Sequence, residues 1–132
     1  MNKVLILILS IFLFQGCSTL KEYNAMSEAE DSCSSFPSSC ASLGETYLKK
    51  KEYAKAAKAF KRACLLFNRT PIYNSMASSD ITFSCLELSR LYKNGIGVSK
   101  NLNYAKQISH GVASRYRKEC SAGNKYACDN LK

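Results

Sequence analysis

Seven cysteines in 132 residues constrain this chain more than any other feature of its sequence. Six of them lie at positions 33, 40, 64, 85, 120 and 128. An even number of cysteines in an oxidising compartment predicts disulfides, whereas the cytoplasm keeps thiols reduced. Three disulfides are therefore expected if the protein is exported, and the many possible pairings of six cysteines stay open at this point.

The N-terminus indicates the compartment. Lys3 supplies a positive charge, residues 4–14 form an apolar run of 11 residues interrupted by Ser10, and the small residue Gly16 precedes Cys17. This order is typical of a secretory signal peptide, which we assign to residues 1–16. A transmembrane helix needs about 20 apolar residues, so the run is too short for one.

The end of this segment, Leu13-Phe14-Gln15-Gly16-Cys17, resembles the lipobox of bacterial lipoproteins. The resemblance implies that Cys17 is acylated and becomes the first mature residue, with residues 17–23 as a tether. An ordinary signal peptide followed by a chance cysteine is the alternative. Ser18 in place of Asp implies the periplasmic side of the outer membrane as the location.

Size and charge limit what the rest of the chain can be. Residues 24–132 suffice for one domain. The chain has 19 Lys and Arg against 10 Asp and Glu. In a cytosolic protein such an excess of positive charge would favour binding to nucleic acid. An exported protein is expected to bind acidic envelope polymers, anionic lipid headgroups or acidic protein surfaces instead.

Apolar residues recur at helical spacing through this domain. Helices are expected at about 24–33, from Cys40, over 53–64, after Asp80, from Asn101 to 112, and at about 125–131. Residues 67–80 are expected to form a polar loop that ends on Asp80 as an N-cap. Gly95 is placed to adopt positive φ after a helix end, and Asn101 to cap the following helix.

Two segments of the chain match one another. Cys40-Ala-Ser-Leu43-Gly-Glu-Thr-Tyr47 aligns with Cys85-Leu-Glu-Leu88-Ser-Arg-Leu-Tyr92, and Tyr53-Ala-Lys-Ala aligns with Tyr104-Ala-Lys-Gln. Cys128 begins a third, truncated copy. A helix pair cannot bury its apolar face alone, so the pattern predicts an all-α solenoid of about two helix-pair repeats with flanking helices.

The repeat resembles known families. Leu43-Gly-x-x-Tyr47 and the Tyr53-x-x-Ala helix resemble tetratricopeptide repeats, and Gly95-x-Gly97-Val98-x-Lys100-Asn101 resembles the loop of the Sel-like (SLR) repeat. With its paired cysteines, the chain over 33–132 is similar to the Helicobacter cysteine-rich protein family. The pattern weakens at the 67–80 insertion and over 107–119, where Gly111 replaces the Phe60-type packing residue.

In that family each α/α repeat carries a disulfide, which implies the pairs Cys33–Cys40, Cys64–Cys85 and Cys120–Cys128. Helix geometry agrees with this. Eight positions of one helix would separate the Cα atoms of Cys120 and Cys128 by about 12 Å, and a disulfide needs less than about 7 Å, so the chain must reverse between them. A zinc site is the alternative interpretation of the cysteines. No C-x₂₋₄-C pair is present, however, so we expect no metal.

The resemblance also raises an enzymatic alternative, because some relatives are associated with penicillin binding and weak β-lactamase activity. Ser18-Thr-Leu-Lys21 has the Ser-x-x-Lys spacing of serine β-lactamases, but it lies in the tether, and the Ser-Asp-Asn and Lys-Thr-Gly elements are absent. His110 is the single histidine and is expected at the surface. We therefore expect a binding module without catalytic residues or cofactors.

Two surfaces are candidates for binding. Repeats of this type bind peptides along each first helix, which implies a groove formed by Glu45, Lys49, Arg90 and Asn94 for a protein or peptide of the cell envelope. The second candidate is basic, and its cations are Lys49, Lys50, Lys51, Lys55, Lys58, Lys61 and Arg62. These residues form either a solvated outer face or a contact with anionic headgroups or an acidic partner. The protein is expected to be a monomer.

Overall fold

The helical periodicity of the sequence becomes five helices in the computed structural model, which describes residue 33, residues 36–67, residue 69 and residues 76–131. The helices are α2 (Pro37–Lys49), α3 (Tyr53–Phe67), α4 (Met76–Asn94), α5 (Leu102–Ser121) and α6 (Lys125–Asp129). No strand occurs within these ranges. The predicted signal peptide, the tether with Cys17, and residues 24–32 lie outside the described residues.

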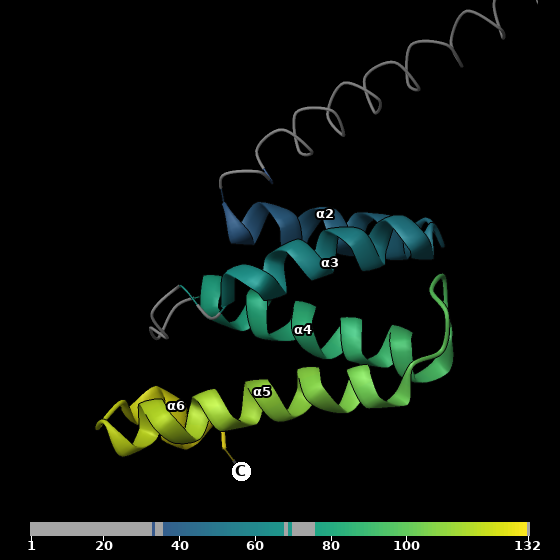
Figure 1. The fold of residues 1–132 in the computed structure, drawn as a ribbon. Helices are drawn as coiled ribbons and strands as arrows, with labels where there is room; N and C mark the ends of the chain where they lie inside the picture. The colour runs from purple at the N-terminus through teal and green to yellow at the C-terminus, as the bar shows by residue number, and fades with distance from the viewer. Residues whose placement is uncertain (1–32, 34–35, 68, 70–75, 132) are drawn as a thin grey trace, which may run out of the picture.

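Consecutive helices pack against each other, and α2 also contacts α4. Figure 1 shows that each of the long helices doubles back on the one before it, with α2 and α3 at one end of the stack and α5 and α6 at the other. This confirms the all-α prediction. None of the helices in the described part of the chain is long and apolar enough to cross a membrane.

Local sequence signals set several helix ends. Pro37 occupies the first turn of α2, where a missing N–H costs nothing. The Asn101 side chain accepts a hydrogen bond from the Tyr104 N–H at 2.9 Å, and Gly95 has φ 69°, both as the sequence predicts. The predicted N-cap at Asp80 is wrong, because α4 already begins at Met76. No Gly or Pro lies between Met76 and Asp80, so nothing local stops the helix from extending backwards.

The core consists of two adjoining clusters of buried side chains. The larger joins α2, α3 and α4 around Phe60 and Leu91, which are both fully buried. Four alanines of α3 let the neighbouring helices approach Phe60 closely: Ala56, Ala57, Ala59 and Ala63. The smaller cluster joins α3, α4, α5 and α6 around Phe67 and Tyr116, and Cys64 and Ile108 pack against both clusters.

Three disulfides each link two cysteines that are consecutive along the chain. The Sγ atoms lie 2.11 Å apart in Cys33–Cys40, 2.18 Å in Cys64–Cys85 and 2.03 Å in Cys120–Cys128. The bridge between Cys64 and Cys85 connects α3 to α4. It therefore links the first helix pair, α2 and α3, to the second helix pair, α4 and α5. The chain reverses between Cys120 and Cys128 through Gly123, which has φ 92°.

The loop between α4 and α5 also ties the two helix pairs together. Ile96 and Val98 pack against the larger core cluster. Gly97 has φ 70°, and a Cβ placed on it would lie 2.6 Å from the backbone nitrogen of Ala54 in α3. The second pair's loop therefore rests directly on the first turn of α3, an approach that only glycine permits here.

Replacing Gly97 with Ala is expected to lower the free energy of unfolding by about 2–3 kcal/mol, because the substitution adds a backbone overlap to the cost of a left-handed alanine. Urea unfolding followed by circular dichroism measures this. Gly123→Ala is the matched control, since Gly123 also has positive φ but no atom within 4 Å of its Cβ position. It should cost only about 1 kcal/mol, and equal costs would contradict the contact between the loop and α3.

Candidate functional site

A groove between α4 and α5 is the strongest candidate for a binding site in the described part of the chain. Its volume is about 440 Å³. The α4–α5 groove is lined by Leu86, Ser89, Arg90, Lys93, Asn94, Leu102, Ala105, Lys106 and Ser109. Two of these residues, Arg90 and Asn94, belong to the predicted groove.

Ser89 of α4 and Ala105 of α5 lie at the base of this groove. The Ser89 hydroxyl donates a hydrogen bond to the carbonyl oxygen of Ala105 at 2.8 Å, which fixes α4 against α5. Ala105 is buried and has too small a side chain to fill the space above it. The groove therefore lies between two helices whose spacing is held by a hydrogen bond at its base.

Apolar side chains that remain in water mark the groove. Leu86 is 47% exposed and Leu102 is 49% exposed, and they line the groove from α4 and α5 respectively. Phe83 lies one turn before Leu86 on the same face of α4 and is 41% exposed. An apolar group of this kind on a small protein is typical of a surface that binds a partner.

Cations surround these leucines. Lys93 and Lys106 are exposed, and Arg90 makes two contacts with one carboxylate oxygen of Glu87, at 2.9 Å from Nε and 2.8 Å from Nη2. The hydrogen bond with Glu87 raises the pKa of Arg90, outweighing the opposite effect of burial. The guanidinium is thus oriented and charged, with N–H donors still directed elsewhere. The α4–α5 groove suits a ligand that combines apolar side chains with carboxylates.

The other half of the predicted groove is not part of this site. Glu45 is half-buried and Lys49 is exposed on α2, and neither lines the α4–α5 groove. Sequence reasoning missed Leu86 and Leu102, although a signal was present. Both are apolar but fall outside the buried stripes of their helices, which include Leu88 on α4 and Ala105 on α5.

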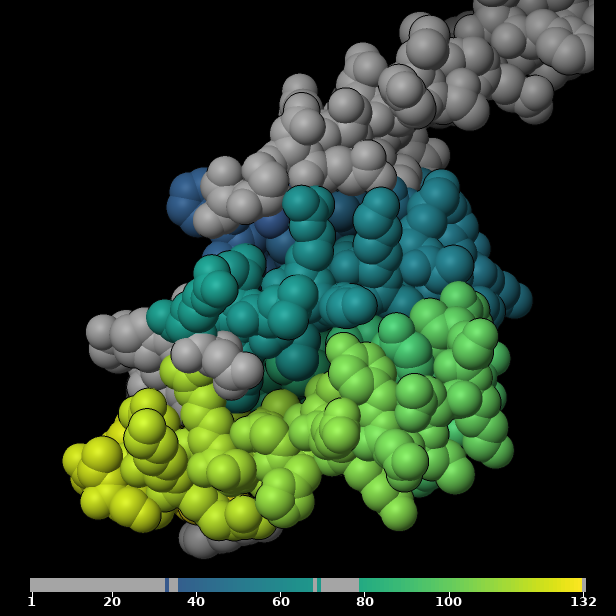
Figure 2. All heavy atoms as spheres, viewed as in Figure 1, coloured from purple at the N-terminus to yellow at the C-terminus, as the bar shows by residue number. Residues whose placement is uncertain are grey.

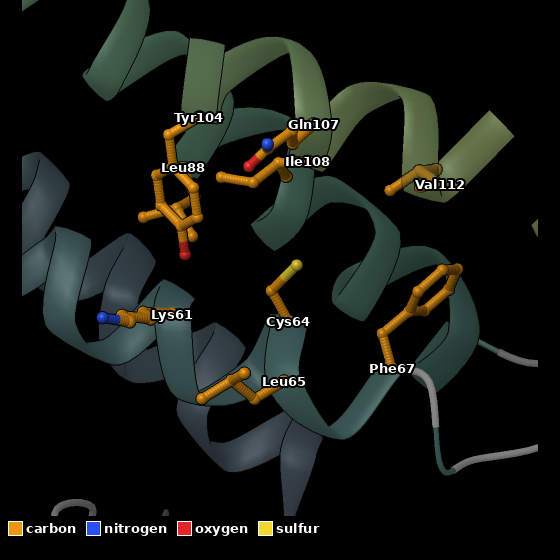
Figure 3. Close-up of a pocket in the computed structure, with 10 residues that line it drawn as sticks. Lys61, Cys64, Leu65, Phe67, Leu88, Tyr104, Gln107, Ile108 and Val112 are labelled. Carbon is orange, nitrogen blue, oxygen red and sulfur yellow. The ribbon is translucent and has the colours of Figure 1, made fainter. Parts of the chain in front are cut away.

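A smaller hollow of about 210 Å³ lies between α3 and α5. Figure 3 shows the Cys64 side chain of α3 pointing toward α5, from which Gln107 and Ile108 extend, and Leu88 of α4 also lines the hollow. The hollow also includes Gly111, whose Cβ position has no atom within 4 Å. Gly111, which the sequence alignment matches to Phe60, has no side chain to fill this hollow.

His110 is exposed on α5, as predicted. No group of three His, Cys, Asp or Glu side chains that could hold a metal ion occurs in the described ranges. Ser18-Thr-Leu-Lys21, the Ser-x-x-Lys match, lies outside them.

Comparisons with family models, curated proteins and solved structures find no match to this chain. The geometry described above is therefore the basis for assigning a function.

Proposed function

We propose that this protein is an exported lipoprotein, anchored through Cys17 on the periplasmic side of the outer membrane, whose helical repeats bind an acidic segment of a partner protein. The observation that carries the binding role is the α4–α5 groove. It combines Leu86 and Leu102, each about half exposed, with the cations of Arg90, Lys93 and Lys106. A peptide that buries these leucines gains affinity from apolar contact and orientation from its carboxylates.

The proposed repeat organisation is supported by the environments of matching residues. Cys40 and Cys85 are both fully buried, and Leu43 and Leu88 are both nearly so. The counterpart of the buried Tyr47 is Tyr92, which is half-buried and packs edge-on against Tyr104 with ring centroids 4.8 Å apart. Two copies of one helix pair, stacked on each other, account for these equivalences.

Export is supported by the disulfides. Three bridges use all six cysteines after Cys17, and such bridges persist only in oxidising compartments. Mass spectrometry of the native protein tests the anchor. We expect an N-terminus at Cys17 carrying acyl chains, and a free thiol at Cys17 would contradict the lipoprotein assignment.

Selection of displayed random peptides on the immobilised mature chain, residues 17–132, tests the binding role. We expect the recovered peptides to combine Leu, Ile or Phe with Asp or Glu. Leu86→Ala with Leu102→Ala should weaken them about 30-fold, because each half-exposed leucine contributes about 1 kcal/mol when it becomes buried. Arg90→Glu should weaken them further by charge repulsion.

Leu65→Ala is the matched control, because Leu65 is an exposed leucine outside the α4–α5 groove, at 61%. It should leave the affinity of these peptides unchanged. Peptides that bind equally well to the double leucine variant would show that the α4–α5 groove is not their site, and failure to recover any acidic peptide would contradict the proposed ligand.

A further inference from the structure

The outward surface of α3 is not used by the binding role proposed above. We define the α3 face by Ala54, Lys55, Lys58, Lys61, Arg62 and Leu65, all of which are exposed. Their spacing places them on one side of the helix, opposite the buried alanines and Phe60. Residues 53–67 contain no acidic side chain, and the Glu52 carboxylate before them pairs with Lys55.

The α3 face combines charge with an apolar centre. Leu65 is 61% exposed and lies at helical spacing from Lys58, Lys61 and Arg62. Lys49, Lys50 and Lys51 extend the positive charge beyond the start of the helix. Cations around an exposed apolar residue are the pattern of helices that lie on anionic lipid, where charge attracts the headgroups and the apolar residue enters the interface.

Cys33, which follows the proposed tether in sequence, lies beside the α3 face. Cys33 lines a hollow between α2 and α3 together with Lys55, Lys58 and Arg62. Cys33 lies sixteen positions after Cys17, the start of the mature chain, and this stretch spans at most roughly 55 Å when extended. A chain anchored at Cys17 therefore holds the α3 face within reach of the membrane and raises its effective concentration there.

The charge of the tether does not cancel that of the surface. Residues 17–32 contain Lys21 and four acidic residues, whereas residues 49–62 contain seven Lys and Arg and one Glu. The two segments together keep a net charge of +3.

We propose that the α3 face docks on anionic phospholipid headgroups. This inference rests on the proposed membrane anchorage and adds an orientation to it: α3 lies against the membrane, and Leu65 enters the headgroup layer. Figure 2 shows atoms of α3 and α5 exposed on the same side of the molecule, with α3 nearer to α2. An anchor and a basic surface together bind more firmly than either does alone.

Vesicle flotation of the unacylated mature chain, residues 17–132 with Cys17→Ser, tests the surface without the anchor. We expect binding to vesicles that contain phosphatidylglycerol and none to phosphatidylcholine vesicles. Binding should be lost in 1 M salt, where charges are screened beyond about 3 Å. Lys58→Glu, Lys61→Glu and Arg62→Glu together should weaken it by at least on the order of a hundredfold, since each cation contributes about fivefold.

A matched control separates the surface from net charge. Arg117→Glu, Lys118→Glu and Lys125→Glu change the same residue types by the same charge at exposed positions of α5 and α6. These changes should leave most of the binding intact. Leu65→Ser should weaken binding about fivefold, whereas Leu86→Ser, in the α4–α5 groove, should not.

Three results would overturn the inference: equal loss in the two charge-reversal variants, binding to neutral vesicles, or no binding to any vesicle. The last would assign the α3 face to an acidic protein instead. Because the tested chain carries no lipid, these results are independent of whether Cys17 is acylated. A failed anchor and a failed α3 face are therefore distinguishable.

Discussion

Replacing Cys64 and Cys85 together with Ala is expected to lower the free energy of unfolding by about 3 kcal/mol, the largest loss for any of the three disulfides. These cysteines are 21 positions apart, against 7 and 8 in the other pairs. A longer closed loop removes more entropy from the unfolded chain, so its loss should cost more. The bridge also joins α3 to α4, one of the contacts that connect α2 and α3 to α4 and α5.

Urea unfolding of the three double Cys→Ala variants under non-reducing conditions measures this order. Cys33→Ala with Cys40→Ala, and Cys120→Ala with Cys128→Ala, should each cost about 2.5 kcal/mol. Reduction of the wild type should remove all three contributions, which together approach the whole stability of a small domain, about 5–15 kcal/mol. A wild type that unfolds at the same urea concentration with and without reductant would contradict a stabilising role for the bridges.

Phe60→Ala is expected to cost about 3–5 kcal/mol, because Phe60 is fully buried at the centre of the larger core cluster. Gly44 in α2 leaves room for the buried Phe60 ring. A Cβ on Gly44 would overlap Cδ1 and Cε1 of the Phe60 ring and lie 3.0 Å from its Cγ. Gly44→Ala should therefore cost about 1–3 kcal/mol, although alanine is ordinarily better than glycine within a helix by about 1 kcal/mol.

A double-mutant cycle isolates this contact. In the Phe60→Ala background, Gly44→Ala should cost much less than it does alone, or should stabilise, because the ring that it would strike has been removed. Gly111→Ala is the control, since Gly111 also lies within a helix but has open space at its Cβ position. It should raise stability by about 1 kcal/mol. Additive costs at Gly44 and Phe60 would show that the two residues do not constrain each other.

The parts of the fold that depend on neighbours in sequence could be predicted. Asn101 caps α5 with its own side chain, and Gly95 ends α4 in the left-handed conformation, because both are local consequences of residue type. The start of α4 could not be predicted in this way. Asp80 is a good N-cap in isolation, yet the helix begins at Met76.

The candidate site could be predicted only in part. Arg90 and Asn94 were identified from the repeat and do line the α4–α5 groove, but Glu45 and Lys49 do not. Leu86 and Leu102 were passed over because each lies off the buried stripe of its own helix. Leu86 and Leu102 become neighbours because α4 packs against α5. The sequence pattern of a single helix does not encode this packing.

The sequence by itself determined the helical character of the domain, the cap of α5 at Asn101, and the apolar stripe on each helix, since these follow from periodicity and local hydrogen bonding within a few residues. Only the tertiary structure decided which exposed residues share a groove, and which glycines are irreplaceable. Gly97 and Gly123 both have positive φ. Only the approach of α3 to Gly97 makes Gly97 far more costly to replace than Gly123. Such distinctions arise from contacts between residues distant in sequence, which local pattern does not encode.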